Sequence, residues 1–468
     1  MNVIAPRAPK GWLAENLMCA ALAALIFGQF VALGATTPLL SAIGAGLELL
    51  LGLGVIALSL SAVSAGYWRR FYPLGLLLLA AAAWQCRPLW QGLAPALGGL
   101  PGWRAPLTPD AAGLEALKLL GAGACALSAA VLARSRVRAI RLTNWLVVGG
   151  GAYVLLSLWL WRWDPFYVWG IAKGGHTWSF TGSLLSANAA GCVFGMISLL
   201  SLGLAQSMSR SLDLHAPRLR ELLLFGAACL GVVAALAATA LTGSRTSLIL
   251  TAVMTALLAI VDLNRIHDGT RLPRLIGAGV LGVIFLTVAL GVGLAPIAAK
   301  TGIGEEFGTR LAAYGDYWKA AVAAPWSGYG AGAFAVVNAA ILPGDRMDDR
   351  WSFAAAHCAP LQALLEGGLP FLLLLAAVLL TSIIQPLHAW LARKAASAAG
   401  LAALAAGLLA LGCSAVDVAL NIPAIAAFFA TALGLAWGSS AGLDLPQRLG
   451  AAVMGWSGRG SAQQAGAT

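Results

Sequence analysis

Long apolar runs are the feature that most limits what this chain can fold into. They recur along most of its 468 residues, of which 60% are hydrophobic and only 10% charged. A helix needs about 20 apolar residues to cross the hydrocarbon core of a bilayer. Only helices and closed barrels satisfy their backbone groups in lipid, and these runs are too long and too uniformly apolar for barrel strands. The sequence therefore predicts an all-α integral membrane protein.

We expect about twelve transmembrane helices, each from one apolar run. The first apolar run follows Arg7 and Lys10, as the apolar part of a signal peptide follows basic residues. It is long and lacks a clear cleavage site, so we expect it to be retained as a membrane span. The third run is short and could be broken. The runs cover about 17–35, 41–65, 71–86, 116–133, 142–161, 188–208, 222–241, 247–263, 275–298, 366–387, 398–420 and 424–440.

The distribution of positive charge predicts the topology. The net charge of +11 would suggest a nucleic-acid partner, but most of the 29 Lys and Arg residues lie on alternate loops between the runs and at both termini. The positive-inside rule assigns these loops and both termini to the cytoplasm. We therefore expect no nucleic-acid partner, a membrane domain over residues 1–443, and a disordered cytoplasmic tail over 444–468.

The same topology places one large loop, residues 300–368, on the outer side. In this loop Phe307, Leu311, Tyr314 and Trp318 recur at spacings of 4, 3 and 4, which predicts a helix with these side chains on one face. We expect that helix to lie on the membrane surface with its aromatic face down and Arg310 at the edge of the face.

A glycine run follows this helix, from Pro325 to Phe334. Gly328, Gly330 and Gly332 could let the backbone approach a ligand, but no strand precedes them, so they do not form a dinucleotide fingerprint. A flexible turn is the favoured interpretation. The first outward loop, 87–115, is rich in Pro and Gly and is expected to be a structural connector.

Two outward residues are the main candidates for chemistry. His357 lies just before the tenth run, so its imidazole is expected at the outer membrane surface. A lone histidine is more often structural, but Arg310 in the same loop and Arg245 favour a functional role. Arg245 stands in Leu-Thr-Gly-Ser-Arg-Thr-Ser between two apolar runs, alone on the outer side, and its planar fork of donors suits a phosphate group.

Acidic residues leave more alternatives open. Asp417, near the outer end of the eleventh run, could pair with Arg245 or another cation, and that structural role is at least as plausible as catalysis. Glu366, at the mouth of the tenth run, has the same standing. The seven cysteines form no disulfide framework, although Cys86 and Cys358 could pair. No metal-type Cys/His cluster and no Asp-x-Asp motif in the 300–368 loop is present, so we expect neither metal nor cofactor.

Taken in order, these motifs resemble the O-antigen ligase and polymerase superfamily of multispan glycan-transfer proteins. The resemblance covers about residues 178–370 and rests on four segments. They are Thr242-Gly-Ser-Arg245, Arg310 with Tyr314, Trp318, Pro325 and the glycine run to Phe334, His357 with Leu361 and Glu366-Gly367, and Phe180-Thr-Gly-Ser up to Asn188. One departure is Cys358, where the family often has Asn after the histidine.

The resemblance implies a metal-independent glycosyltransferase of the bacterial inner membrane. It would move a glycan from an undecaprenyl diphosphate carrier to an acceptor at the periplasmic face, without a nucleotide sugar. Arg245 and Arg310 would then stabilise the diphosphate, and His357 would be the general base for the acceptor hydroxyl or a hydrogen-bond donor to the diphosphate. Tyr314, Trp318, Asn188 and Glu366 are the candidate substrate-binding residues.

Several functions remain open from the sequence. We expect an O-antigen ligase, whose acceptor is lipid A-core; a repeat-unit polymerase of the same superfamily would use another lipid-linked glycan as acceptor. A transporter or flippase is the alternative from another class. It is less favoured because no repeat relates the two halves and the notable polar groups gather at the outer face rather than at the bilayer midplane.

Overall fold

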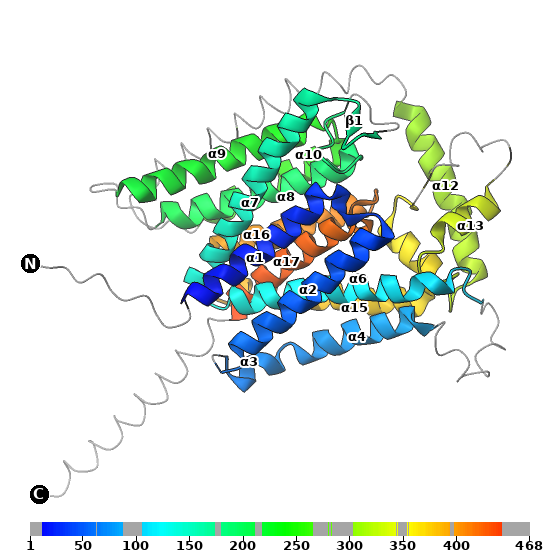
Figure 1. Ribbon diagram of the computed structural model, residues 1–468, viewed down its shortest axis with the longest axis horizontal. Helices are drawn as coiled ribbons and strands as arrows, with labels where there is room; N and C mark the ends of the chain where they lie inside the picture. The colour runs from blue at the N-terminus through cyan, green and yellow to red at the C-terminus, as the bar shows by residue number, and fades with distance from the viewer. Residues whose placement is uncertain are drawn as a thin grey trace, which may run out of the picture.

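The computed structural model describes residues 12–61, 63–87, 105–173, 179–210, 218–264, 303–342, 355–393 and 397–441, together with isolated positions, and within 303–310 it describes the backbone alone. Over these ranges the chain is a bundle of long helices with one very short hairpin (Figure 1). The predicted tail 444–468 lies outside the described residues, and so does the predicted span 275–298 apart from two isolated positions.

Most of the described elements are long helices. The long helices are α1 (Trp12–Val31), α2 (Pro38–Ser59), α4 (Tyr72–Gln85), α6 (Ala112–Leu132), α7 (Arg136–Trp163), α8 (Ala187–Ser209), α9 (Leu219–Leu241), α10 (Arg245–Asn264), α12 (Ile303–Ala323), α15 (Ala359–Arg393), α16 (Ala398–Ser414) and α17 (Pro423–Ala441). The short elements are η1 (Leu33–Ala35), α3 (Ala65–Arg69), η4 (Pro109–Ala111), β1 (Tyr167–Val168), β2 (Ile171–Ala172), α13 (Phe334–Ile341) and η7 (Ala419–Asn421).

The prediction of an all-α membrane protein is confirmed. Nine of the described helices are long and apolar enough to cross a bilayer, and α4 and α16 are shorter apolar helices. The short third run is α4, one unbroken helix of 14 residues. Several predicted boundaries were wrong by about six residues. The helix α2 ends at Ser59 rather than near 65, and α7 begins at Arg136 rather than near 142. The helix α15 covers Ala359–Arg393 rather than about 366–387, and α16 ends at Ser414 rather than near 420.

Hydroxyl side chains mark where many of these helices begin. At each such position a Ser or Thr oxygen accepts a hydrogen bond from a backbone N–H in the first helical turn, which satisfies a donor that has no partner inside the helix. These capping residues are Thr37, Ser64, Ser135, Ser186 and Ser397.

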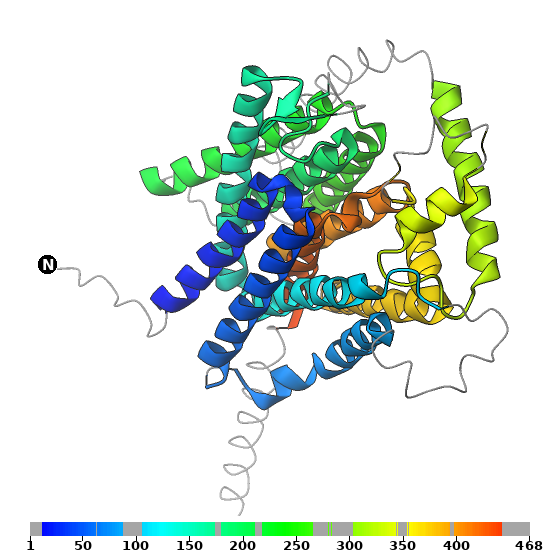
Figure 2. The ribbon, with the colours of Figure 1, turned by 45° about the vertical axis from the view of Figure 1, so that its right-hand side comes forward.

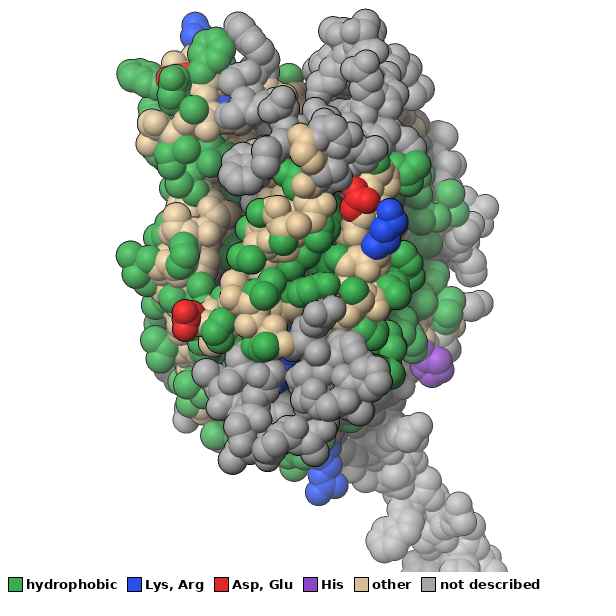
Figure 3. Space-filling view, turned by 90° about the vertical axis from the view of Figure 1, so that its right-hand side faces the viewer, with side chains coloured by type: hydrophobic (Ala, Val, Ile, Leu, Met, Phe, Trp, Pro, Cys, Tyr) green, Lys and Arg blue, Asp and Glu red, His purple; other side chains and the backbone are tan. Residues whose placement is uncertain are grey.

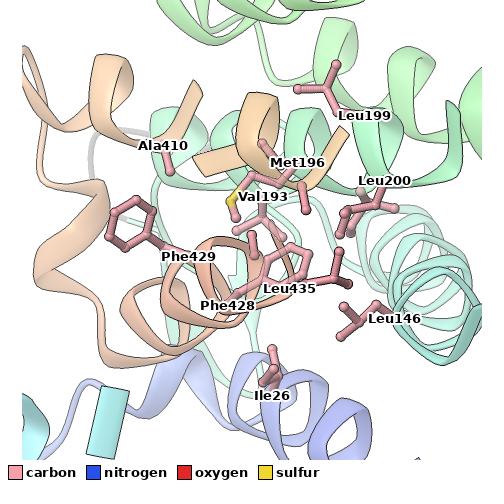
Figure 4. Packing of buried hydrophobic residues seen from close by; sticks show 14 of the residues in the cluster. Ile26, Leu146, Val193, Met196, Leu199, Leu200, Ala410, Phe428, Phe429 and Leu435 are labelled. Carbon is pink, nitrogen blue, oxygen red and sulfur yellow. The ribbon is translucent and has the colours of Figure 1, made fainter. Parts of the chain in front are cut away.

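The centre of the bundle is formed by α8 and α17, which are the most buried of the candidate spans. In Figure 4 Val193 and Met196 of α8 point toward Phe428 and Leu435 of α17. Small residues let helices approach closely: a side chain at Gly434 of α17 would lie within 2.7 Å of the carbonyl carbon of Ala126 in α6. Close backbone contact of this kind is typical of helix packing in membranes.

A second, smaller core lies at one end of the bundle, where α12 and α13 cross the end of α15 (Figure 2). It contains Tyr317, Phe334 and Leu365, and the Tyr317 hydroxyl donates to Asn338 Oδ1 at 2.8 Å. A helix is present where the sequence predicts one, as α12; its place in an outer loop on the membrane surface stays a prediction. Leu311 and Trp318 lie on its exposed side, whereas Tyr314 packs against the small core.

The glycine run is not a flexible turn; that prediction was wrong. Gly328 and Gly330 have positive φ values, and their segment pairs with the point where α15 is interrupted by Gly368 (φ 70°, ψ −175°). Tyr329 N donates to Leu365 O, Gly330 N to Glu366 O, and the amide of residue 369 to Pro325 O. Glycine is therefore needed here because the backbone of residues 325–330 packs directly against the backbone of residues 365–369.

The outer end of α4 is bonded to the same junction. Arg87, only 1% exposed, donates to the carbonyl oxygens of Ser327 and Glu366, and Trp84 Nε1 donates to Gly367 O at 2.7 Å. Burial lowers the pKa of Arg87 to about 10, so its guanidinium remains charged at neutral pH. The first outward loop is thus tied to the third, in line with the predicted connector.

Positive charge gathers at the opposite end of the bundle. Glu15, near the start of α1, accepts from Arg134 and Arg138, with its oxygens 2.7 and 2.9 Å from their nitrogens. Arg210 is paired with Asp262 at the ends of α8 and α10. These are loops that the sequence assigns to the cytoplasmic side.

Candidate active site

The end of the molecule that carries α12 and α13 shows few charged side chains among those coloured in Figure 3. Within it, His357 and Asp417 meet although they are far apart in the sequence. His357 Nδ1 lies 3.2 Å from Asp417 Oδ1. Because an ionised carboxylate only accepts hydrogen bonds, the proton sits on Nδ1, and Nε2 is then the basic nitrogen. His357 Nε2 has no hydrogen-bond partner in the described part of the chain.

The backbone of His357 is held in an unusual conformation. Its φ is +52°, a region that costs a non-glycine residue roughly 1–2 kcal/mol. The Tyr314 hydroxyl donates to His357 O at 2.7 Å, and the ring of Phe353 stands edge-on to the imidazole at 4.8 Å between centroids. Backbone strain that surrounding contacts over-determine is often found at functional sites. Tyr314 is therefore part of the site, because its hydroxyl donates a hydrogen bond to the backbone of His357.

A side-chain amide network lies beside this pair, and the sequence did not indicate it. Gln362 Oε1 accepts from the amide of Ala356 at 3.1 Å and from Asn421 Nδ2 at 2.5 Å, while its Nε2 donates to Glu366 Oε1 at 3.1 Å. The sequence signal that could have revealed the network is the spacing of Gln362 and Glu366, two polar residues four positions apart in an otherwise apolar helix.

Glu366 is bound within the protein itself. Its carboxylate accepts from Gln362 Nε2 and lies beside the backbone N–H groups of Gly332 and Phe334, the latter being the first residue of α13. A negative charge in this position favours the N-terminus of α13. A direct contact of Glu366 with substrate stays a prediction, and it would have to use the remaining acceptor capacity of these oxygens.

Arg245 begins α10 at a sharp turn rich in hydroxyl groups. The turn is made by Gly243 (φ 69°), and Thr242 Oγ1 accepts from Ser244 N at 3.2 Å. Arg245 is half-buried and makes no hydrogen bond or ion pair in the described part of the chain. Its suggested pairing with Asp417 was therefore wrong. A helix N-terminus with an unpaired guanidinium is suited to an anion.

The helix α16 contacts the helix that begins at Arg245 and leads into the turn that carries Asp417. Ser247 Oγ, in the first turn of α10, donates to Asn188 O at 3.3 Å and lies 3.6 Å from Cys413 Sγ. Cys413 is on α16, four residues before Asp417. The Arg245 turn, the start of α8 and the His357–Asp417 pair therefore surround the outer end of α16. All seven cysteines are free, so the suggested pair of Cys86 and Cys358 is not formed.

The structure shows no contact of Arg310 or Trp318 with the His357–Asp417 pair within the ranges that it describes. Arg310 lies on α12, but its side chain is outside the described residues, so its approach to His357 stays a prediction. Trp318 is 57% exposed on α12. Among the described residues there is no group of three or more side chains that could hold a metal ion.

A large apolar cavity opens beside the amide network. Its volume is about 1670 Å³, and it is lined by α2, α4, α6, α15 and α17. Gln362, Glu366 and Asn421 line its outer end, while Trp68, Ser382 and Trp437 line the end near the basic loops. Several lining residues, including Leu53 and Leu76, are exposed on the surface of the bundle, so the cavity is open to the side.

A comparison with protein families places the central region of the chain in a known family model. Residues 230–376, from within α9 to within α15, match the family model described as O-Antigen ligase. This stretch contains Arg245, Arg310, His357 and Glu366, whereas Asn188 and Asp417 lie outside it. No curated protein matches the chain. The predicted resemblance to O-antigen ligase-like proteins is confirmed.

Proposed function

Given that its central region matches the O-antigen ligase family, we propose that this multi-pass membrane protein is an O-antigen ligase. It would transfer a glycan from undecaprenyl diphosphate to a lipid A-core acceptor, with no metal ion. The observation that carries the proposal is the His357–Asp417 pair at the end of α16, whose Nε2 bonds to none of the described residues. Arg245 begins α10, which packs on the same helix.

His357 is the general base in this proposal. The acceptor hydroxyl attacks the anomeric carbon of the donor glycan, and the bond from that carbon to the diphosphate oxygen breaks. The hydroxyl proton passes to His357 Nε2, and the bond electrons leave with the diphosphate. Asp417 keeps the proton on Nδ1 and stabilises the imidazolium that forms, which is the role a carboxylate plays beside a catalytic histidine.

Arg245 and the N-terminus of α10 receive the diphosphate. Negative charge grows on the leaving group as the glycosidic bond breaks, so preorganised cationic donors lower the barrier. Arg245 is supported for this role because it makes no hydrogen bond or ion pair with any of the described residues. Arg310 is proposed as the second cation, while Asn188 and Trp318 are proposed to contact the glycans.

The apolar cavity supports a lipid-linked substrate. Most of its lining is apolar, so a cavity of this size that opens toward the bilayer is suited to hydrocarbon. We infer that it takes the undecaprenyl chain, since its outer end reaches the residues beside His357. We further propose that the site faces the periplasm and that both termini lie in the cytoplasm, as the positive-inside rule favours; a fluorescent protein fused to the C-terminus should then fluoresce.

The proposal is tested by reconstituting the purified protein in vesicles with lipid-linked donor and lipid A-core acceptor. His357→Ala and Arg245→Ala should each lower the rate of transfer by about 10²-fold or more. Matched controls are His388→Ala, an exposed histidine at the other end of α15, and Arg218→Ala, an exposed arginine before α9. Both controls should keep the wild-type rate.

Full activity in either site variant would remove that residue from the mechanism. Replacing the acceptor distinguishes the two members of the superfamily: transfer to lipid A-core identifies a ligase, and transfer only to a second lipid-linked repeat unit identifies a polymerase. Amounts of inserted protein and melting temperatures, measured for every variant, separate loss of chemistry from loss of folding.

A further inference from the structure

The His357–Asp417 pair needs support from elsewhere, because neither residue lies inside a helix. His357 precedes α15 in a non-helical segment, and Asp417 lies between α16 and η7. Their own hydrogen bond, at 3.2 Å, is at the long end of the usual range. A bond of this length between two loop residues does not by itself fix the direction in which the imidazole points.

Gln362 contacts both of these segments at once. Its Oε1 accepts from the amide of Ala356, the residue before His357, and from Asn421, four residues after Asp417. Gln362 itself is on the first turns of α15, a rigid element. The Tyr314 hydroxyl holds the carbonyl on the other side of His357. The backbone around the strained histidine is therefore held at two points, one on each side.

The chemistry of these contacts requires an amide at position 362. Two donors converge on its oxygen, while its nitrogen faces the carboxylate of Glu366. A carboxylate at 362 would accept the same two bonds but would stand against Glu366, and an alkyl group would leave the amide of Ala356 without a partner. Only the amide satisfies all three neighbours.

We propose that Gln362, with Asn421 as its partner, is a positioning residue that aligns His357 with Asp417 for proton transfer. This rests on the proposed function of the His357–Asp417 pair. Gln362 acts through the backbone of the histidine and touches neither of its ring nitrogens. Loss of the amide should therefore reduce turnover more than donor binding.

Kinetics of vesicle-reconstituted variants provide the first test. Gln362→Leu should lower kcat by about 10-fold to 100-fold, the usual cost of a small misalignment, and leave the KM for the lipid-linked donor within about twofold. The control is Gln385→Leu, a glutamine on the same helix whose oxygen has no hydrogen-bond partner in the described part of the chain. Wild-type kcat in Gln362→Leu, or an equal loss in the control, would overturn the proposal.

A swap of the two side chains tests the chemical requirement. Gln362→Glu alone places two carboxylates together and should lose activity, whereas the double variant Gln362→Glu with Glu366→Gln restores one amide and one carboxylate. The double variant should recover at least half of the lost log kcat. No recovery over the single variant counts against the proposal.

A spectroscopic measurement does not depend on glycan transfer at all. The chain has 5 histidines, so ¹⁵N-histidine labelling with His357→Ala as the assignment reference isolates one imidazole. Nδ1 should be the protonated nitrogen in wild type and in Gln385→Leu, and a mixture of tautomers should replace it in Gln362→Leu. An unchanged imidazole signal in Gln362→Leu would overturn the positioning role, whereas inactivity of wild type towards every acceptor would overturn the proposed function alone.

Discussion

Asp417 is the residue on which the acid–base assignment depends most. Its carboxylate contacts His357 Nδ1 and accepts from Val418 N at 2.7 Å, so its orientation is fixed by the backbone of its own turn. Replacing the carboxylate with an amide keeps the size and removes the charge that stabilises a protonated imidazole. An amide can also present its N–H₂ to the ring and so favour the wrong tautomer.

We therefore expect Asp417→Asn to lower kcat by about 10²-fold with little change in the KM for the lipid-linked donor. Asp262→Asn, which removes a carboxylate at the opposite end of the bundle, is the control and should stay within about threefold of wild type. A tenfold rise in donor KM with unchanged kcat would mean instead that Asp417 acts in binding.

The sequence indicated single functional residues better than it indicated which residues contact each other. His357 and Arg245 could be identified because a histidine at the edge of a span and a lone outer arginine are both unusual. The partner of Asp417 could not, because His357 is 60 residues away and only tertiary packing brings the two together. Arg87 was missed for a related reason: a single arginine after an apolar run looks like a loop residue, yet it is buried among backbone carbonyls.

Among the elements, α15 is two helices joined at Gly368. The residue has φ 70° and ψ −175°, which only glycine adopts readily, and a methyl group there would lie within 2.6 Å of the carbonyl carbon of Trp326. The first part of α15 carries Gln362 and Glu366, and the second part carries the apolar span. The break thus separates the part of α15 that supports the site from the part that anchors it.

Gly368→Ala should destabilise the protein by about 2–4 kcal/mol, through the backbone conformation and the steric contact together. The measurement is thermal unfolding in detergent, followed by transfer activity. Gly315→Ala in α12 is the matched control, because nothing lies within 4 Å of the added methyl group and alanine favours a helix by about 0.5–1 kcal/mol. Equal melting temperatures in the two variants would contradict this account of the break.

Most element boundaries follow from local signals that the sequence carries. Helix starts at Ser135, Ser186 and Ser397 coincide with capping hydroxyls. The start of α15 was missed since hydropathy alone detects the span after Gly368, whereas the turns before it are helical because they pack against α12 and α13. Similarly, the glycine run has the composition of a flexible turn and becomes ordered only through its pairing with residues 365–369.

The whole molecule has two sides relative to α16. The Arg245 turn lies on the side of α8 and α10, whereas the apolar cavity lies on the side of α4, α6 and α15. The proposed donor spans both, with its diphosphate near Arg245 and its chain in the cavity. A side chain that obstructs the cavity should therefore weaken binding of a lipid-linked donor and leave His357, Asp417 and Arg245 unchanged.

Gly75 on α4 allows this to be tested, because it lines the cavity and a side chain there meets nothing within 4 Å. Gly75→Phe should raise the KM for undecaprenyl-linked donor by about tenfold, the effect of excluding one or two methylene groups. A donor analogue with a short, water-soluble chain should be transferred at the wild-type rate. Gly54→Phe on α2, equally unobstructed but outside the lining, is the control. If both variants affect both donors alike, the cavity does not hold the chain.

The class of fold was predictable from the sequence because lipid leaves so few ways to satisfy a backbone. The arrangement of the helices was not, since nearly all of them are apolar on every side and hydropathy does not show which pack at the centre. The most buried of the candidate spans, α8 and α17, meet their neighbours closely at small residues such as Gly203 and Gly434, but other helices do so too. The cavity depends on the same packing and could not have been inferred.

The central position of α17 has a consequence for biosynthesis. Phe428 of α17 stacks edge-on with Phe27 and Phe30 of α1, with ring centroids 5.5 and 6.0 Å apart, so the first described span of the chain rests on the last. The ribosome delivers α1 some 400 residues before its neighbour. Until translation reaches α17, the faces of α1 and α6 that will receive it stand open in the bilayer, and the core is completed only once α17 has been inserted.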